Sequence, residues 1–364
     1  NEDPVGAHAM AVREALGAMP VLQCLAVAAL PGQTAVIRYP RLVNVGPEMM
    51  DLAVQKEAGQ NIPYDLNEVY LDWTLLADSM EGDQRQMKVL LVAAKHEVID
   101  ARVQILQAAE LQCGILGVDS LALADAAEAC GYLKEGETVA LINIGLSSAS
   151  IHFVKDGVSN FIRDVSWGAR ELIQAIAKDR RVDFEEAERQ LQRSGEAPEP
   201  AKGQAPAEAA PAPPPMPRHD DPFGEAPPVV SGGSLLDPLD EELGGGGLSA
   251  PPRRPTPDAQ SDVREVLHGP LGRMVAEVRR SFDYYEHQLY ERPVDRIVLS
   301  GGVANLTLLR ETLMDELGVD AVDVADPLRS SLMLGDDPAI APLKQFPSAY
   351  MVAIGLAARG MADI

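Results

Sequence analysis

Residues 296–305 constrain the fold of this chain more than any other segment. Ile297, Val298 and Leu299 predict a buried strand that runs directly into the pair Gly301-Gly302. Apolar residues then recur at helical spacing: Leu306, Leu309 and Leu313. Two glycines at such a turn allow a positive φ angle and leave no Cβ in the way of a ligand. The N–H groups of the turn and the helix start would then face a phosphate or a sugar. A tight strand-to-helix turn that merely requires glycine explains the segment equally well.

A second segment, residues 138–157, predicts a hairpin with a small polar turn. Strands are expected at 139–144 and 150–154, with Gly145, Ser147 and Ser148 between them. Asp156-Gly157 then predicts a tight turn into a third strand at 158–165. A hydroxyl-rich turn can wrap phosphates with N–H and O–H donors. Taken alone, an ordinary hairpin is the simpler interpretation.

Together these segments resemble the actin-like ATPase superfamily. Asn143-Ile-Gly-Leu-Ser-Ser-Ala-Ser-Ile151 is similar to the second phosphate loop, Asp-Ile-Gly-x-x-x-Thr-x-x, and residues 299–305 to the adenosine loop. Residues 349–359 resemble the closing helix, Ala-x-x-x-Ala-x-Gly-Leu-Ala. The resemblance implies an actin-like (ribonuclease H-like) two-lobe α/β fold that binds ATP with Mg²⁺. The implied contacts are Asn143, Gly145, Ser147, Ser148, Ser150, Arg280, Gly301, Gly302 and Asn305.

Within that superfamily the chain is most similar to the PilM family of type IV pilus assembly proteins. The order and spacing of several weak motifs carry this resemblance. They are Ala29-Leu-Pro-Gly32, residues 61–73 with Ile-Pro-Tyr, residues 89–100 with Val-Leu-Leu-Val-Ala-Ala, and residues 114–123, 167–173, 184–188 and 279–285.

Two departures from the family pattern qualify the expected activity. The first phosphate loop, normally near the N-terminus, is not found; we expect a fragment without the first strands, or else a divergent member. Asn143 stands where the family has Asp, so a carbonyl oxygen remains but the charge that helps to hold a Mg²⁺-bound water is lost. We therefore expect nucleotide binding with at most weak ATPase activity and assign no catalytic residue.

The pattern of apolar residues predicts an α/β organisation, and the family resemblance divides the chain into six parts. It implies that residues 1–19 are a remnant of the first lobe and that 20–118 resemble the small ββ/α/β interaction subdomain shared by PilM and FtsA. Residues 119–135 form a first-lobe helix, and 136–194 and 261–364 the second lobe. Residues 195–260, rich in Pro, Ala and Gly, are expected to be a flexible insertion. Residues 261–290 predict one long helix, kinked or broken at Gly269-Pro270.

Composition excludes several classes of protein. A net charge of −24 and a pI of about 4.6 argue against nucleic-acid binding. The chain has no apolar run long enough to cross a bilayer, so direct membrane insertion is not expected. Cys24, Cys113 and Cys130 lack the spacing of metal ligands, and no metal site is predicted.

The resemblance implies a cytoplasmic scaffold, peripheral to the inner membrane through its partner. That partner would be the cytoplasmic tail of a PilN-like membrane protein, with other pilus inner-membrane components nearby and self-association left open. A type II secretion-like machine and an FtsA-like cytoskeletal role are the alternatives. A sugar kinase would need a catalytic base, and an Hsp70-like chaperone a substrate domain, that we do not find.

Overall fold

The computed structural model describes residues 3–17, 25–81, 84–195, 262–329 and 340–362. All of these belong to one compact unit, formed by residues 1–197 and 261–364. The predicted insertion at 195–260 lies, apart from Gly195, outside the described residues.

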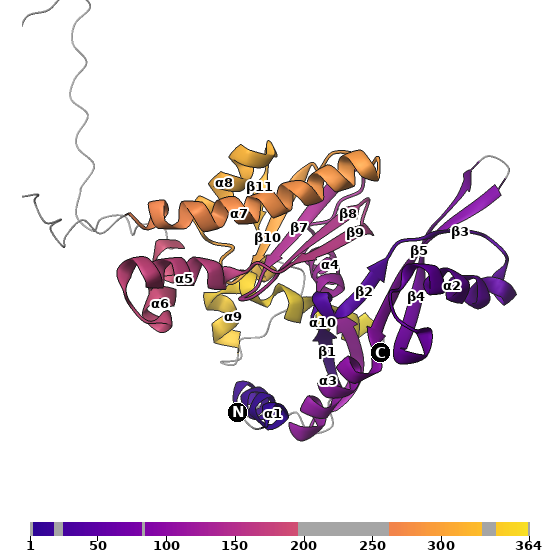
Figure 1. The fold of residues 1–364 in the computed structure, drawn as a ribbon, viewed down its shortest axis with the longest axis horizontal. Helices are drawn as coiled ribbons and strands as arrows, with labels where there is room; N and C mark the ends of the chain where they lie inside the picture. Colours follow the sequence, from indigo (N-terminus) through magenta and orange to yellow (C-terminus); the bar gives the residue numbers. More distant parts are fainter. Residues whose placement is uncertain (1–2, 18–24, 82–83, 196–261, 330–339, 363–364) are drawn as a thin grey trace, which may run out of the picture. The chain divides into compact units, whose positions relative to one another are not determined.

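A five-stranded sheet forms the largest part of the structure (Figure 1). Its strands, in spatial order, are β11 (Val322–Val324), β10 (Arg296–Gly301), β7 (Thr138–Ile144), β8 (Ala149–Lys155) and β9 (Val158–Val165). β10 is parallel to both of its neighbours, whereas β7, β8 and β9 form an antiparallel meander. The predicted hairpin, its third strand and the strand before the glycine pair are therefore confirmed. The three-residue edge strand β11 was not predicted.

Both faces of this sheet are covered, which is why β7 is apolar almost throughout. Ala140, Ile142 and Ile144 point to the face that carries helix α7 (Val263–Asp283). Val139 and Leu141 point to the other face, against α4 (Asp119–Ala129) and α10 (Met351–Ala362). On the α7 side, aromatic rings are stacked in the core: the ring centroids of Phe153 and Tyr285 lie 4.4 Å apart.

Residues 261–290 predict one long helix, kinked or broken at Gly269-Pro270, and helix α7 is not broken there. It continues through Pro270 as far as Asp283 and then widens into a short π-helix, Tyr284–Gln288. Pro270 is buried among the core residues that face the sheet. Gly269 has no neighbouring atom within 4 Å of where a side chain would start, so the turn before the proline is uncrowded. Burial of the apolar face therefore outweighs the one backbone hydrogen bond that the proline removes.

The predicted small subdomain contains a second sheet, of four strands. Strand β5 (Gln84–Lys95) pairs along one edge with β2 (Ala35–Arg38) and β3 (Arg41–Val43), and along the other with β4 (Val69–Glu81). Helix α2 (Pro47–Asn61) covers one face of it. A separate parallel pair, β1 (Leu25–Leu30) and β6 (Gln112–Val118), lies with α3 (His96–Ala108), against which α1 (Pro4–Leu16) packs. The remaining helices are α5 (Ala169–Arg180), α6 (Phe184–Gly195), α8 (Thr307–Leu317) and the short α9 (Ala341–Gln345).

A buried hydrogen-bond chain joins the small subdomain to the large sheet. The Tyr39 hydroxyl lies 2.7 Å from Ser159 Oγ, which lies 2.8 Å from Nε2 of His152. The other ring nitrogen of His152 is 2.8 Å from the carbonyl oxygen of Ser120 at the start of α4. Burial lowers the pKa of His152 to about 4, although the Ser120 carbonyl acts in the opposite direction. His152 is therefore neutral at pH 7, and the chain is held without a buried charge.

Helix α10 approaches α4 closely at Gly355. A Cβ placed on Gly355 would lie 1.7 Å from the carbonyl oxygen of Ala122, so only glycine permits this contact. The glycine of the closing-helix motif is thus required by helix packing.

We expect Gly355→Ala to lower the free energy of unfolding by about 3 kcal/mol or more, through backbone overpacking. Alanine is intrinsically about 1 kcal/mol better than glycine inside a helix, so a loss can only come from the contact. Urea unfolding followed by circular dichroism measures it. Ala353→Ser, on the exposed side of the same helix, should change stability by less than about 0.5 kcal/mol. Equal stability of the two variants would contradict this account.

Candidate functional site

A cavity of about 550 Å³ opens where the two predicted loops meet. The β7–β8 turn and the loop after β10 form one side of it, and α5 and α6 form the other. Its size lies within the range of about 300–1,000 Å³ typical of small-molecule sites. It is lined by Ile144, Gly145, Leu146, Ala169, Ile173, Glu188, Leu191, Gln192, Gly302, Val303, Asn305, Leu306, Thr307, Arg310, Gln345 and Phe346.

The two glycines after β10 have different physical roles. Gly301 has a φ of +97°, and a Cβ there would lie 2.1 Å from the carbonyl oxygen of Ile144, so glycine is needed for β10 to pair with β7. Gly302 is exposed and has no atom within 4 Å of a Cβ position. It leaves the wall of the cavity open, next to Asn305.

Two helices begin at this cavity, and one of them has an open N-terminus. The first two N–H groups of α5, from Ala169 and Arg170, donate to the carbonyls of Gly145 and Leu146 at 2.9 and 2.8 Å. Helix α8 has no side-chain cap at Leu306 and no acidic residue in its first turn. The N–H groups at the start of α8, which begins at the cavity-lining Thr307, are therefore available to an anionic ligand.

Polar residues form a row across four strands beside the cavity. Ser300, Asn143, Ser150 and Asp164 are paired in register from β10 to β9. Ser300 Oγ donates to Asn143 Oδ1 at 3.1 Å. The predicted residues Asn143 and Ser150 are thus adjacent, while Ser147 and Ser148 lie in the turn that the Gly145 N–H closes by donating to the Ser148 carbonyl at 2.9 Å.

An acidic pair ends this row. Asp119 accepts hydrogen bonds from the N–H groups of Gly32 and Ser120, at 2.8 and 2.7 Å. The carboxylate of Asp164 packs against Gly32, where a Cβ would lie 2.4 Å from its oxygen. Burial, and then the charge of Asp119, raises the pKa of Asp164 to about 6; burial also raises the pKa of Asp119. Ionisation of Asp164 is therefore unfavourable, because its carboxylate is packed against Gly32 and lies near the charge of Asp119.

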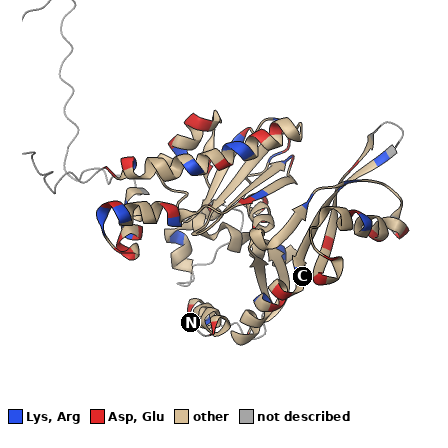
Figure 2. Cartoon of the chain, viewed as in Figure 1, with Lys and Arg blue, Asp and Glu red and all other residues tan. Residues whose placement is uncertain are grey.

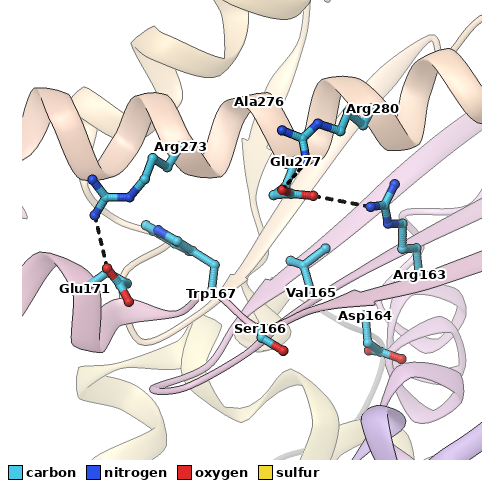
Figure 3. Close-up of a pocket in the computed structure, with 10 residues that line it drawn as sticks. All are labelled: Arg163, Asp164, Val165, Ser166, Trp167, Glu171, Arg273, Ala276, Glu277 and Arg280. Carbon is cyan, nitrogen blue, oxygen red and sulfur yellow. Dashed lines mark hydrogen bonds and ion pairs between the residues drawn. The ribbon is translucent and has the colours of Figure 1, made fainter.

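Of the nine predicted contacts, Gly145, Gly302 and Asn305 line the cavity, whereas Asn143, Ser147, Ser148, Ser150 and Gly301 do not. Arg280 lies elsewhere. Its guanidinium binds Glu277 at 2.5 Å and lines a different cavity, between α7 and the end of β9 (Figure 3). The structure brings Gly145, Gly302 and Asn305 together in the first cavity, with Gly301 packed behind it, but it does not bring Arg280 there.

Several lining residues were not predicted as contacts. Glu188 ends the segment 184–188 of the family resemblance, but the helix that carries it and Gln192 has the amphipathic pattern of any surface helix, and Arg310 belongs to the ordinary charged face of α8. Within the described residues, no three acidic, histidine or cysteine side chains come close enough to hold a metal ion. None of the described helices has the length and apolar character needed to cross a bilayer.

The fold and the cavity define a class: this is an actin-like α/β protein. The family model for the type IV pilus assembly protein PilM matches residues 6–204 and 258–361, so the chain belongs to the PilM family. The resemblance seen in the sequence is thereby confirmed, and the match interrupts at 205–257, within the predicted insertion.

One solved structure supports the fold, and more distant ones match more weakly. The chain is 20% identical to a PilM–PilN type IV pilus biogenesis complex, with a TM-score of 0.66, covering 98% of this chain and 85% of that one. MreB5 of Spiroplasma citri bound to ADP matches at 10% identity and a TM-score of 0.42, over 72% of this chain and 65% of that one. The cytoplasmic domain of EpsL, an inner-membrane component of the Vibrio cholerae type II secretion system, matches at 13% identity and a TM-score of 0.31, over 48% and 63%. Only the first of these scores is high enough to support the fold.

We expect Asp164→Asn to stabilise the protein above pH 6 by on the order of 1–2 kcal/mol, after allowance for partial solvent screening. The pKa of Asp164 is raised in the folded state from its ordinary 3.8 to about 6, so folding takes up a proton between these values. Relative to the variant, the native chain therefore gains stability as pH falls from about 7 to 4. Denaturant unfolding at several pH values measures this difference.

The matched control is Asp320→Asn, at an exposed position in the loop after α8. It should alter the unfolding free energy by less than about 0.5 kcal/mol. A stability difference between native chain and Asp164→Asn that does not depend on pH would show that the carboxylate is not strained by burial.

Proposed function

We propose that this chain is a nucleotide-dependent scaffold of type IV pilus assembly that binds ATP in the first cavity. The observation that carries the proposal is the convergence of Gly145, Gly302 and Asn305, from loops more than 150 residues apart, on one cavity. The nucleoside would lie beside Gly302 and Asn305, facing Glu188 and Gln192 of α6. The phosphates would extend toward the β7–β8 turn and the open start of α8.

The proposed scaffold turns ATP over slowly, if at all. Asn143 is neutral, and its side-chain oxygen already accepts the Ser300 hydroxyl. Glu188 is the one carboxylate that lines the described part of the cavity. Mg²⁺ would therefore be coordinated by the phosphates of ATP and by water, as this ion commonly is. Bound nucleotide would act on the protein through its contacts with the β7–β8 turn and with the loop after β10.

Titration calorimetry with Mg²⁺-ATP tests the nucleotide proposal on the full chain. We expect saturable binding, and at least a tenfold rise in Kd for Gly302→Val, because the valine side chain would enter the cavity without a clash in the fold. Gly272→Val makes the same change at an exposed position of α7 and should leave Kd within twofold. Arg280→Gln should also leave it unchanged, since Arg280 lies outside the cavity. No binding by the native chain would refute the proposal.

The proposed partner is the cytoplasmic tail of a PilN-like inner-membrane protein, which would hold the scaffold at the cytoplasmic side of that membrane. A groove of about 390 Å³ supports this assignment. It lies between α4 and the face of the small sheet that α2 does not cover, with Leu76, Leu90 and Val92 toward one side and Leu121 toward the other. Asp72 and Glu128 add negative charge at the groove. An extended apolar segment with a basic residue matches this lining.

We expect Leu76→Arg to weaken binding of a labelled PilN tail peptide at least tenfold in fluorescence anisotropy, because a charge would be placed in the apolar groove. Leu52→Arg is the matched control. Leu52 is 59% exposed on α2, which packs on the opposite face of the same sheet, so its replacement should leave Kd within twofold. Equal losses for the two variants would place the tail elsewhere.

Deletion of residues 205–257 is a second control. The PilM family model passes over this stretch, so the tail should bind the shortened chain with unchanged Kd.

A further inference from the structure

A second cavity, of about 580 Å³, lies beside the five-stranded sheet, in the part of the protein that we call the large lobe (Figure 3). Its walls come from the end of β9, the start of α5 and one side of α7. Figure 3 shows Trp167 extending toward α7 from the segment between β9 and α5. None of the pocket's lining residues is shared with the first cavity.

Three guanidinium groups, from Arg163, Arg273 and Arg280, gather around this space. The lining also holds three carboxylates, those of Asp164, Glu171 and Glu277. Asp164 points away from α7 in Figure 3 and packs against Gly32, so the arginines on the α7 side face two carboxylates. Figure 2 shows that basic and acidic residues alternate along α7.

One carboxylate is shared between two of these arginines. Glu277 binds Arg280 at 2.5 Å through one oxygen and Arg163 at 3.3 Å through the other. Glu171 binds Arg273 at 3.0 Å. Each guanidinium carries five N–H donors, so most donors in this group have no protein acceptor in these pairs. The side chains of Arg273 and Arg280 are 61% and 63% exposed, which leaves them able to turn toward a ligand.

A buried donor supplies an independent sign of a missing acceptor. Trp167 is only 6% exposed, and its Nε1–H has no hydrogen-bond partner within the part of the chain that the structure describes. A buried N–H group without an acceptor is destabilising, and most such groups in proteins are paired. In Figure 3 the indole nitrogen lies on the side of the ring that faces α7, between the two groups of ion pairs.

We propose that this second cavity binds a phosphate group, either free or carried by a small phosphorylated molecule. Arg273, Arg280 and Arg163 would donate to its oxygens in the paired manner that guanidinium groups favour, and Trp167 Nε1–H would complete the set. Glu277 would keep one arginine in place while releasing the other. The volume exceeds what a phosphate alone would fill and accommodates an attached organic group.

The site is separate from the proposed nucleotide cavity, yet one short segment borders both. Trp167 lines the second cavity and Ala169 the first. Gly168, between them, lies against the β7–β8 turn, where a Cβ would be 2.5 Å from the Leu146 carbonyl oxygen. A phosphate held by Trp167 would thus act directly on the backbone that supports the turn.

The chain has two tryptophans, so indole N–H signals in ¹H–¹⁵N spectra report the site directly. Trp167→Phe assigns the Trp167 signal by its loss, and Trp73 in β4 serves as an internal reference. We expect inorganic phosphate to shift the Trp167 signal saturably while Trp73 does not move, and sodium chloride at matched ionic strength to have no such effect. Ribose 5-phosphate provides the second arm: binding at least tenfold tighter than inorganic phosphate identifies a phosphorylated molecule, and equal Kd values identify free phosphate.

The double variant Arg273→Gln/Arg280→Gln should raise the Kd for phosphate at least tenfold. Arg264→Gln removes the same charge from α7 at a position that pairs with Glu311 instead, and should leave the Kd within twofold. The side chains of Arg264, Arg273 and Arg280 are each exposed by half or more, so the variants are expected to fold. Thermal unfolding of each variant checks this expectation. A Trp167 shift that never saturates, that chloride reproduces, or that survives in the double variant overturns the proposal.

Discussion

The parallel pairing of β10 with β7 is the contact on which the rest of the structure depends. It joins parts of the chain that lie on either side of residues 196–261, and it requires Gly301 because any Cβ would collide with the Ile144 backbone. This pairing brings the β7–β8 turn beside the loop after β10, and it places Ser300 against Asn143. Without it there would be neither a two-sided core nor a shared cavity.

Much of this arrangement could be predicted from the sequence, because apolar alternation and glycine placement act locally. The hairpin at 138–157 and the strand at 297–299 follow from such patterns, and their motifs helped to identify the family. Only part of the polar row could be predicted: Asn143 and Ser150 belong to a motif, whereas Asp164 joins the row through its pairing with Ser150, which strand register decides. Arg280 shows the opposite limit, since helix rotation decides which cavity a basic residue faces. The helix break that Pro270 favours does not occur, because burial of the helix face outweighs a local helix-breaking signal.

The two cavities of the large lobe differ in what they offer a ligand. The first presents backbone groups, small residues and the start of a helix, which suit a ligand that is recognised by its shape. The second presents flexible cationic side chains around one buried indole N–H, which suit charge more than shape. Their common border at Gly168 means that occupancy of either one bears on the same turn. In a scaffold of the kind proposed, two small molecules would then act on one turn without any catalytic step.

The same strand pairing also sets an order for folding during synthesis. Ser300 follows Asn143 by 157 residues, so at about 5–20 residues per second the ribosome needs roughly 8–30 s to deliver β10 after β7 has emerged. During that interval the apolar strand β7 is an unpaired edge of the meander formed by β7, β8 and β9. An exposed edge of this kind is prone to pair with other chains. Newly made protein should therefore depend on chaperones until β10 is available.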